Sequence, residues 1–216
     1  MNKITGIFIF VFLISCGKSG EIKTVITAFS GPVKVNSISL TAAETAIKPG
    51  DIIETGDKSF CDIMINEKNI LRIKENSRLV LHVTATDSFL KLEKGWLGGI
   101  TRAKFTEEGK YKINTPTVAA AIRGTSFCVK VEDEKNTYFC VCNGTINLAE
   151  AGKESGEDVT ASHHAAKRFT RDADGSIKTD SNPGLLYHTD EGVEEMAAMI
   201  NEDRKSTRLN SSHVSQ

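Results

Sequence analysis

The chain has 216 residues, and its 27 Lys and Arg against 28 Asp and Glu give a formal net charge of -1. This balance produces no overall field that would attract nucleic acid or an acidic membrane surface, so we expect no nucleic-acid partner. With 39% hydrophobic and 25% charged residues, the composition is that of a globular protein that buries one good core.

The first 17 residues have the pattern of an export signal. A lysine precedes an apolar run over residues 4–14, which has the length of a secretory core and is too short to span a bilayer. The run ends in LISCG, which resembles the bacterial lipobox, whose cysteine becomes lipid-modified and then N-terminal after cleavage. We expect a signal peptide over residues 1–15 and a lipidated tether over residues 16–25. The alternative is a plain secreted protein with a chance cysteine.

Lipid on Cys16 would anchor the mature chain to a membrane, because several acyl chains hold a protein where a single chain does not. Lys18 stands close to this cysteine where an aspartate would favour retention in the inner membrane. We therefore expect a lipid-anchored protein of the bacterial cell envelope, at the outer membrane, on either its periplasmic or its surface face.

Short β-rich runs, punctuated by glycine, fill the chain from residue 22 to about residue 170. Leu79, Leu81 and Val83 alternate with polar or charged neighbours, which is the pattern of a half-buried strand. The sequence predicts an all-β fold, a layered or solenoid-like domain of many short strands, over residues 26–168. The expected strands include residues 22–29, 32–35, 52–55, 61–65, 70–73, 79–84 and 89–92.

An eight-residue pattern, apolar-x-apolar-x-x-Gly-x-apolar, occurs three times in this region, with Gly31, Gly95 and Gly144 as its glycines. A weaker fourth copy has His164 in the place of glycine. We interpret each copy as a strand, a tight turn or bulge with positive φ at the glycine, and a second strand that returns to the same core. The alternative is that glycine-punctuated strands produce the pattern by chance.

Beyond residue 168 the alternation stops, and residues 169–204 form a turn-rich extension with a short helix near residues 190–201. Thr189 or Asp190 can cap this helix, and its first turn is acidic. We expect it to pack on the β-domain or to contact a partner. Its apolar positions are Val193, Met196, Ala197 and Ile200.

The last stretch, residues 205–216, contains no acidic residue and no apolar period, so we expect it to be disordered. It also resembles a translated cloning adaptor. Whether this tail is native therefore stays open, and the natural chain can continue differently after Arg204.

Residues 115–129 (TPTVAAAIRGTSFCV) place a single arginine, Arg123, among small residues. A buried arginine needs its N–H donors satisfied by carbonyls or a carboxylate. We therefore interpret Arg123 as an internal hydrogen-bonding hub that serves folding. The alternative is a surface arginine at a turn.

Five sequence blocks together resemble the FecR-type domain: GPVKV at residues 31–35, KPGDIIETG at 48–56, NTP at 114–116, IRGTSF at 122–127 and CNGTI at 142–146. The resemblance spans about residues 26–168 and implies an all-β extracytoplasmic domain, found in sensors that control sigma factors and in freestanding exported proteins. Because the export signal comes first, we expect a freestanding lipoprotein without an anti-sigma segment. The structural signature of the domain would be Thr115, Pro116, Arg123, Gly124, Thr125 and Phe127.

Four cysteines remain besides Cys16, in a chain whose export permits oxidation. If the apolar residues of the two strands around Cys128 and Cys140 share a face, Cys128 lies opposite Cys140 or Cys142. We predict one cross-strand disulfide there, with the remaining cysteine as a candidate partner of Cys61. Reduced, buried cysteines are the alternative. Zinc ligation is disfavoured, because C-x-C without a second cysteine pair lacks the usual spacing.

Sequence patterns of known catalytic sites are missing, and we expect no enzyme, no catalytic residue, no cofactor and no metal. The run GWLGG over residues 95–99 lacks the Gly-Lys-Ser/Thr of a phosphate loop. His163 and His164 are interpreted as turn or strand surface, and residues 172–175 as a turn rather than a calcium loop.

Two functional hypotheses follow from these observations. The first is a lipid-anchored, non-enzymatic envelope protein whose β-domain binds a protein or envelope ligand. The second is a structural or scaffolding lipoprotein of an envelope assembly. In both, the expected partners are the membrane, through the lipid, and an unidentified envelope component.

Overall fold

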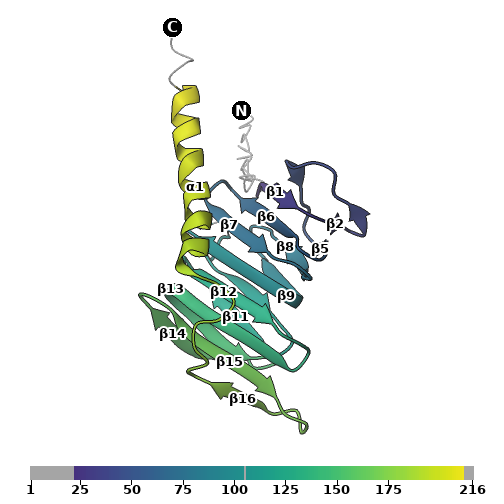
Figure 1. The fold of residues 1–216 in the computed structure, drawn as a ribbon. Coiled ribbons are helices and arrows are strands. Elements are labelled where there is room, and N and C mark those ends of the chain that lie inside the picture. Colours follow the sequence, from purple (N-terminus) through teal and green to yellow (C-terminus); the bar gives the residue numbers. More distant parts are fainter. Residues whose placement is uncertain (1–21, 105, 212–216) are drawn as a thin grey trace, which may run out of the picture.

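The computed structural model describes residues 22–104 and 106–211, with side chains described as far as residue 200. The chain is mostly β, with many short strands and one C-terminal helix, which confirms the predicted fold class (Figure 1). The proposed signal peptide and Cys16 lie outside the described residues.

The strands form two layers that face each other. The first layer, called sheet A, contains in spatial order β4 (Thr45–Ala46), β1 (Thr24–Ser30), β6 (Phe60–Ile65), β7 (Asn69–Ile73), the second half of β9 (Phe89–Thr101), β12 (Ser126–Val131), the first half of β13 (Asn136–Glu150), β15 (Ala165–Arg171) and β16 (Ile177–Asp180).

The second layer, called sheet B, contains in spatial order β3 (Ile38–Ser39), β2 (Val33–Val35), β5 (Asp51–Thr55), β8 (Arg78–His82), the first half of β9, β10 (Tyr111–Asn114), β11 (Val118–Ile122), the second half of β13 and β14 (Glu157–Ala161). Strand β10 runs parallel to β9, and the other pairs are antiparallel. Because β9 and β13 belong to both layers, β9, β10, β11, β13 and β12 close into a small barrel.

The chain passes between the layers at corners where φ is positive. Strand β9 crosses at Gly95 (φ 90°) and β13 crosses at Gly144 (φ 101°), while Gly31 (φ 71°) joins β1 to β2. The fourth copy of the repeat places His164 (φ 49°) between β14 and β15. The interpretation of the repeat is therefore confirmed, since each copy is a corner that joins strands of the two layers.

The main hydrophobic core fills the space between the layers. Leu79 and Leu81 are buried at 0% and 1% exposure, and their neighbour Val80 is half-buried, so the predicted alternation marks the inner face of β8. The inner face of β12 contributes Phe127 and Val129, and β13 contributes Phe139. This core extends through the barrel and through the strands on either side of it.

Helix α1 (Asp190–Ser211) lies along the outer face of sheet A and extends past its edge (Figure 1). Thr189 caps it, because its Oγ1 accepts a hydrogen bond from the Gly192 N–H at 3.3 Å. Met196 and Ile200 are buried against the sheet, so the expectation that the helix packs on the β-domain is confirmed. No helix in the described ranges is long and apolar enough to cross a membrane.

The helix is longer than the sequence predicts. It continues past residue 201, and residues 205–211, which were expected to be disordered, belong to it. This stretch directly continues a helix that begins upstream, and extending a helix is easier than starting one. Residues 212–216 lie outside the described part of the chain.

Candidate ligand-binding site

The outer face of sheet A carries two apolar clusters that are separate from the main core. One consists of Met64, Ile70 and Ile100 beneath Met196 and Ile200 of α1. The other consists of Trp96, Cys128, Tyr138, Cys140 and Cys142, with Leu186 and Val193 packed against it. The segment that leads into α1 and the first turns of the helix therefore cover this face.

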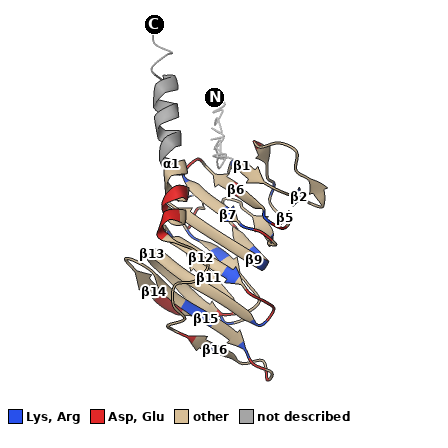
Figure 2. Ribbon diagram, viewed as in Figure 1, with Lys and Arg blue, Asp and Glu red and all other residues tan. Residues whose placement is uncertain are grey.

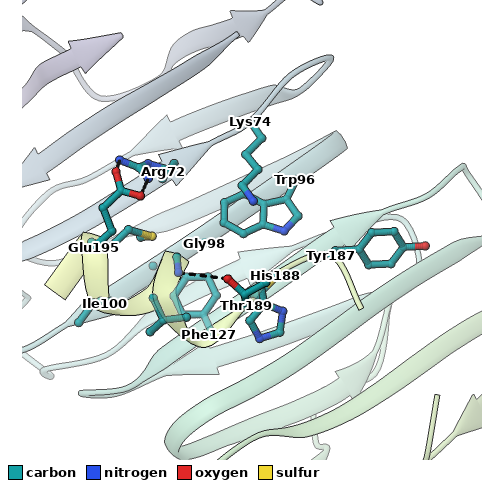
Figure 3. Close-up of a pocket in the computed structure, with 15 residues that line it drawn as sticks. Arg72, Lys74, Trp96, Gly98, Ile100, Phe127, Tyr187, His188, Thr189 and Glu195 are labelled. Carbon is teal, nitrogen blue, oxygen red and sulfur yellow. Dashed lines mark hydrogen bonds and ion pairs between the residues drawn. The ribbon is translucent and has the colours of Figure 1, made fainter. Parts of the chain in front are cut away.

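A cavity of about 460 Å³ lies between the outer face of sheet A and residues 187–196 (Figure 3). Strands β7, β9 and β12 supply its floor, and the loop before α1 and the first turns of the helix supply its opposite wall. The side chains that line it include Arg72, Lys74, Trp96, Tyr187, Val193 and Glu195. A volume of this size is in the range of small-ligand sites.

One wall of the cavity is built on a buried ion pair. Arg72 donates two hydrogen bonds to Asp62, from Nε at 2.6 Å and from Nη2 at 2.8 Å, and Asp62 is fully buried. The hydrogen bonds with Asp62 raise the pKa of Arg72, so the guanidinium stays charged despite its burial. Arg72 also reaches Glu195 of α1 at 3.2 Å, which ties the helix to the sheet.

The floor of the cavity combines an aromatic ring with a cation. The Lys74 ammonium lies 4.3 Å from the centre of the Trp96 ring, within the range of a cation–π interaction. Gly98 leaves room for this indole, because a Cβ at Gly98 would overlap the Trp96 ring. The glycines of GWLGG thus shape a packed aromatic floor, and Gly99 does the same for Phe127 on the inner face.

A second hollow of about 400 Å³ continues from the first. The two share Arg72, Lys74, Trp96 and Tyr187, and the second also has Lys58, Phe60 and Lys130 on its walls. Lys130 is the basic residue of β12, and the first turns of α1 are acidic, as the red segment in Figure 2 shows. The combined surface therefore offers aromatic rings and several lysines to a ligand.

Four of the six signature residues are organised as part of the fold. Thr115 Oγ1 closes the turn between β10 and β11 by accepting from the Val118 N–H at 3.0 Å, and the Pro116 carbonyl accepts a hydrogen bond from Arg171 at 2.5 Å. Thr125 and Phe127 are buried at 3% and 2% exposure. None of these four side chains supplies a polar group to the cavity described above.

The other two signature residues, Arg123 and Gly124, occupy the turn between β11 and β12, and both are exposed. The interpretation of Arg123 as an internal hydrogen-bonding hub is therefore wrong, and it is a surface arginine at a turn. The physical reason is the turn itself: Gly124 has φ 63°, and a Cβ at this glycine would meet nothing within 4 Å, so the turn lies in open space at the surface. It is Arg171 that donates a hydrogen bond to a carbonyl of this block, that of Pro116.

The predicted register of the cysteine strands is confirmed, but the disulfide is not formed. Cys128 lies directly opposite Cys140, with Phe127 opposite Val141 and Val129 opposite Phe139. Cys61, Cys128, Cys140 and Cys142 are nevertheless all free thiols. Opposed Cβ atoms in a sheet stand about 4.5–5.5 Å apart, which exceeds the spacing that most disulfides have.

Cys61 cannot join this group, because it belongs to the core between the layers, whereas the other three cysteines lie on the outer face of sheet A. Burial raises the pKa of the Cys61 thiol to about 12, with the Asp62 carboxylate as a second cause. Burial likewise raises the pKa of Cys128. Both thiols are therefore held neutral and unreactive.

Two of the outer-face cysteines contact histidines: His164, which the sequence assigned to a turn or strand surface, and His188. Cys140 Sγ lies 3.6 Å from His164 Nδ1, and Cys142 Sγ lies 3.3 Å from His188 Nε2. Hydrogen bonds with the Cys142 thiol and with the two histidine rings lower the pKa of Cys140. The hydrogen bond with Cys140, together with burial, raises the pKa of Cys142.

His164 contacts Cys140 through Nδ1 and the Asp190 carboxylate through Nε2. The hydrogen bond with His164 lowers the pKa of the Asp190 carboxyl group. Although burial opposes it, the same hydrogen bond raises the pKa of His164. The sequence missed this cluster because its members come from β13, the β14–β15 corner and the loop before α1. The available signal was the histidine that replaces glycine in the fourth copy of the repeat.

Comparison with known proteins relates part of the chain to one family. The family described as FecR protein matches residues 51–147, which run from β5 into β13 and include the strands that close the barrel. The search of curated proteins gives no match.

Among solved structures, a candidate anti-sigma factor from Parabacteroides distasonis ATCC 8503 is similar in two crystal structures, at 1.65 and 2.50 Å resolution. Each is 13% identical, with a TM-score of 0.48, over 60% of this chain and 59% of the solved chain. The chain thus spans less than two thirds of the solved protein. Residues 51–147 of this chain are thus similar to the FecR protein family.

Proposed function

We propose that this chain is a lipid-anchored, non-enzymatic protein of the bacterial cell envelope whose FecR domain binds a protein or envelope ligand. The observation that carries the proposal is the cavity between sheet A and residues 187–196, which is built on strands of the FecR domain. The lipobox-like residues before Cys16 support the anchor.

The chemistry of the cavity supports a ligand that presents an apolar or aromatic group next to a negative charge. Trp96 and Tyr187 offer ring faces, and Lys58, Lys74 and Lys130 offer cations around them. Arg72 is already paired with Asp62 and Glu195, so the lysines are the cations left to meet an anion. The thiol that lines the cavity, Cys128, is held neutral by burial, which supports a binding role.

The test captures partners from solubilised envelope with the full chain and with Lys74→Glu. Lys74 is exposed, so the substitution leaves the core intact, yet it reverses the charge above Trp96. The matched control is Lys68→Glu, an equally exposed lysine in the β6–β7 turn away from the cavity. We expect the wild type and the control to bind one partner saturably and Lys74→Glu to bind it at least about tenfold more weakly, the effect of losing one contact of about 1.4 kcal/mol.

In the same extracts, Cys16→Ser should release the protein from the membrane fraction, because it removes the atom that carries the lipid. Equal capture by Lys74→Glu and wild type would contradict the cavity as the binding site. Co-sedimentation of many proteins without saturation would instead support the scaffolding role. Membrane retention of Cys16→Ser would contradict the lipid anchor.

A further inference from the structure

Four potential metal ligands meet at one end of the outer face of sheet A. Cys140 and Cys142 project from β13, His164 stands at the corner between β14 and β15, and His188 lies in the loop before α1. The two sulfur atoms, His164 Nδ1 and His188 Nε2 all lie within 4.8 Å of one another. Cys140 and Cys142 are buried and the two histidines are half-buried, so the group is largely shielded from water.

The spacing of these atoms fits a tetrahedral ion. With Zn–S near 2.3 Å and Zn–N near 2.05 Å, tetrahedral angles place sulfur and nitrogen ligands about 3.6 Å apart and two nitrogen ligands about 3.3 Å apart. Here Cys140 Sγ and His164 Nδ1 are 3.6 Å apart, and Cys142 Sγ and His188 Nε2 are 3.3 Å apart. The two nitrogen atoms, His164 Nδ1 and His188 Nε2, are 3.3 Å apart.

Hydrogen bonds on the far side of each ring orient the histidines toward this centre. His164 Nε2 lies 2.6 Å from the Asp190 carboxylate, and His188 Nδ1 lies 2.9 Å from the Leu186 carbonyl oxygen. Because each of these oxygens accepts a hydrogen bond from a ring N–H, the proton of each neutral imidazole is on that side, and Nδ1 of His164 and Nε2 of His188 are free to bind an ion. A carboxylate or carbonyl behind a histidine is the usual support of a metal ligand.

The backbone has an unfavourable conformation at His164 and at the residue before His188. His164 has φ 49° at a corner where three other copies of the repeat have glycine, and Tyr187, directly before His188, has φ 64°. Such conformations are unfavourable for residues with a side chain and persist where the surrounding structure or a function requires them. Glycine would adopt the corner conformation with less strain than histidine, so the chain accepts strain where it places the His164 ring in this group.

We propose that Cys140, Cys142, His164 and His188 bind one Zn²⁺ ion in a closed tetrahedral site. Two thiolates and two neutral imidazoles neutralise the ion, and four protein ligands leave no position for substrate, so the site is structural. The bound ion holds the loop before α1 against β13 and against the β14–β15 corner. Sulfur and imidazole ligands also disfavour Mg²⁺ and Ca²⁺, which prefer oxygen.

The experiment measures Zn²⁺ binding to the full-length, reduced protein by native mass spectrometry, and Co²⁺ binding by the visible bands of tetrahedral, thiolate-bound cobalt. We expect one equivalent of either ion in the wild type. Cys142→Ser and His188→Asn should each lose the ion and the cobalt bands. Asp190→Asn should keep the site with affinity lowered about 10–100-fold, because it removes the support behind His164.

Two matched controls sit next to the ligands. Cys128→Ser removes a buried thiol directly opposite Cys140, and His163→Asn removes an exposed imidazole next to His164. Both should bind one Zn²⁺ like the wild type, and circular dichroism of each variant without metal confirms its fold. Failure of the reduced wild type to bind Zn²⁺ would overturn the proposal, as would full binding by Cys142→Ser. Loss of binding in His163→Asn alone would assign the ion to the exposed group His163, His164 and Asp190 instead.

Discussion

At the scale of single residues, the ion pair between Asp62 and Arg72 on the outer face should contribute strongly to the free energy of unfolding, because both charges are buried. Both residues are buried in the β6–β7 hairpin, directly opposite each other. We expect Asp62→Ala to lower the free energy of unfolding by about 3–5 kcal/mol, because it leaves a buried guanidinium without its bidentate partner. Glu195 compensates little, since its side chain is 60% exposed. Urea denaturation of purified protein measures the change.

The matched control removes an exposed ion pair from the same hairpin. Glu67 lies 3.9 Å from Lys23, and both side chains are about two thirds exposed. Glu67→Ala should therefore change the free energy of unfolding by less than about 0.5 kcal/mol. If Asp62→Ala costs no more than this control, the buried pair contributes nothing and the account of this wall of the cavity is wrong.

The arginines show which residue roles the sequence can predict. Arg123 stands among small residues and in a signature block, yet its exposure follows from the turn geometry at Gly124, which the sequence pattern does not fix. Arg72 stands in the apolar run ILRI, and its neighbours in the sequence do not mark it as half of a buried ion pair. Counting back from the 66–68 turn pairs it with Asp62, so the hairpin register was the signal that could have identified the buried pair.

At the scale of elements, the corners between the layers determine where each strand ends. A Cβ at Gly95 would overlap the side chain and Cα of Ser77, whose Oγ accepts the Trp96 N–H at 2.9 Å. Gly95→Ala should therefore force the corner at Gly95 away from the corner at Ser77, between β7 and β8. Gly152 is the matched control, because its φ of 89° equals the 90° of Gly95 within one degree while nothing lies within 4 Å of its added Cβ.

We expect Gly152→Ala to cost about 1–2 kcal/mol, the strain of positive φ alone. Gly95→Ala should cost about 1–3 kcal/mol more, because overpacking is added to the same strain. Thermal and urea unfolding of the two variants measure the difference. Equal losses would mean that conformation alone, and not the contact between corners, requires glycine at position 95.

The same corners explain what the sequence could predict about the elements. Gly95 and Gly144 recur at a fixed place between apolar residues, so their positive φ and the return of the chain could be inferred from local chemistry. The even register of β12 on β13 could be inferred because one face of each strand is apolar. The contact of Cys142 with His188 could not be inferred, because it depends on the path of residues 172–189 across sheet A.

At the scale of the whole molecule, two separate contacts hold the fold together. One is the core between sheets A and B, the other is the contact between sheet A and α1, and their hydrophobic clusters consist of different residues. The core between the layers contains Phe139 and Val129, whereas the contact with α1 contains Met196 and Ile200 on the outer face. The cavity and the Cys–His group both lie on the outer face of sheet A, beneath the loop before α1 or the first turns of the helix. Ligand access at this face therefore depends on how firmly the start of the helix is held, rather than on the stability of the barrel.

This separation predicts that the helix can be loosened without unfolding the sheets. Met196→Ala combined with Ile200→Ala should raise amide exchange over residues 190–200 by at least about tenfold, since each truncation of a buried side chain costs about 2–5 kcal/mol where it packs fully. Protection in β12 and β13 should stay unchanged, because the core side chains of these strands lie on the inner face. Exchange is measured in chelator, so that no ion holds the start of the helix.

Glu194→Ala, an exposed position on the same helix, is the matched control and should leave exchange as in the wild type. If the double variant instead lowers protection in β12 and β13 together with the helix, α1 and the layers unfold as one unit. The helix would then be a part of the β-domain's stability rather than a cover over its outer face. Opening the cavity to a ligand would in that case require partial unfolding of sheet A, because Arg72 and Glu195 connect the two.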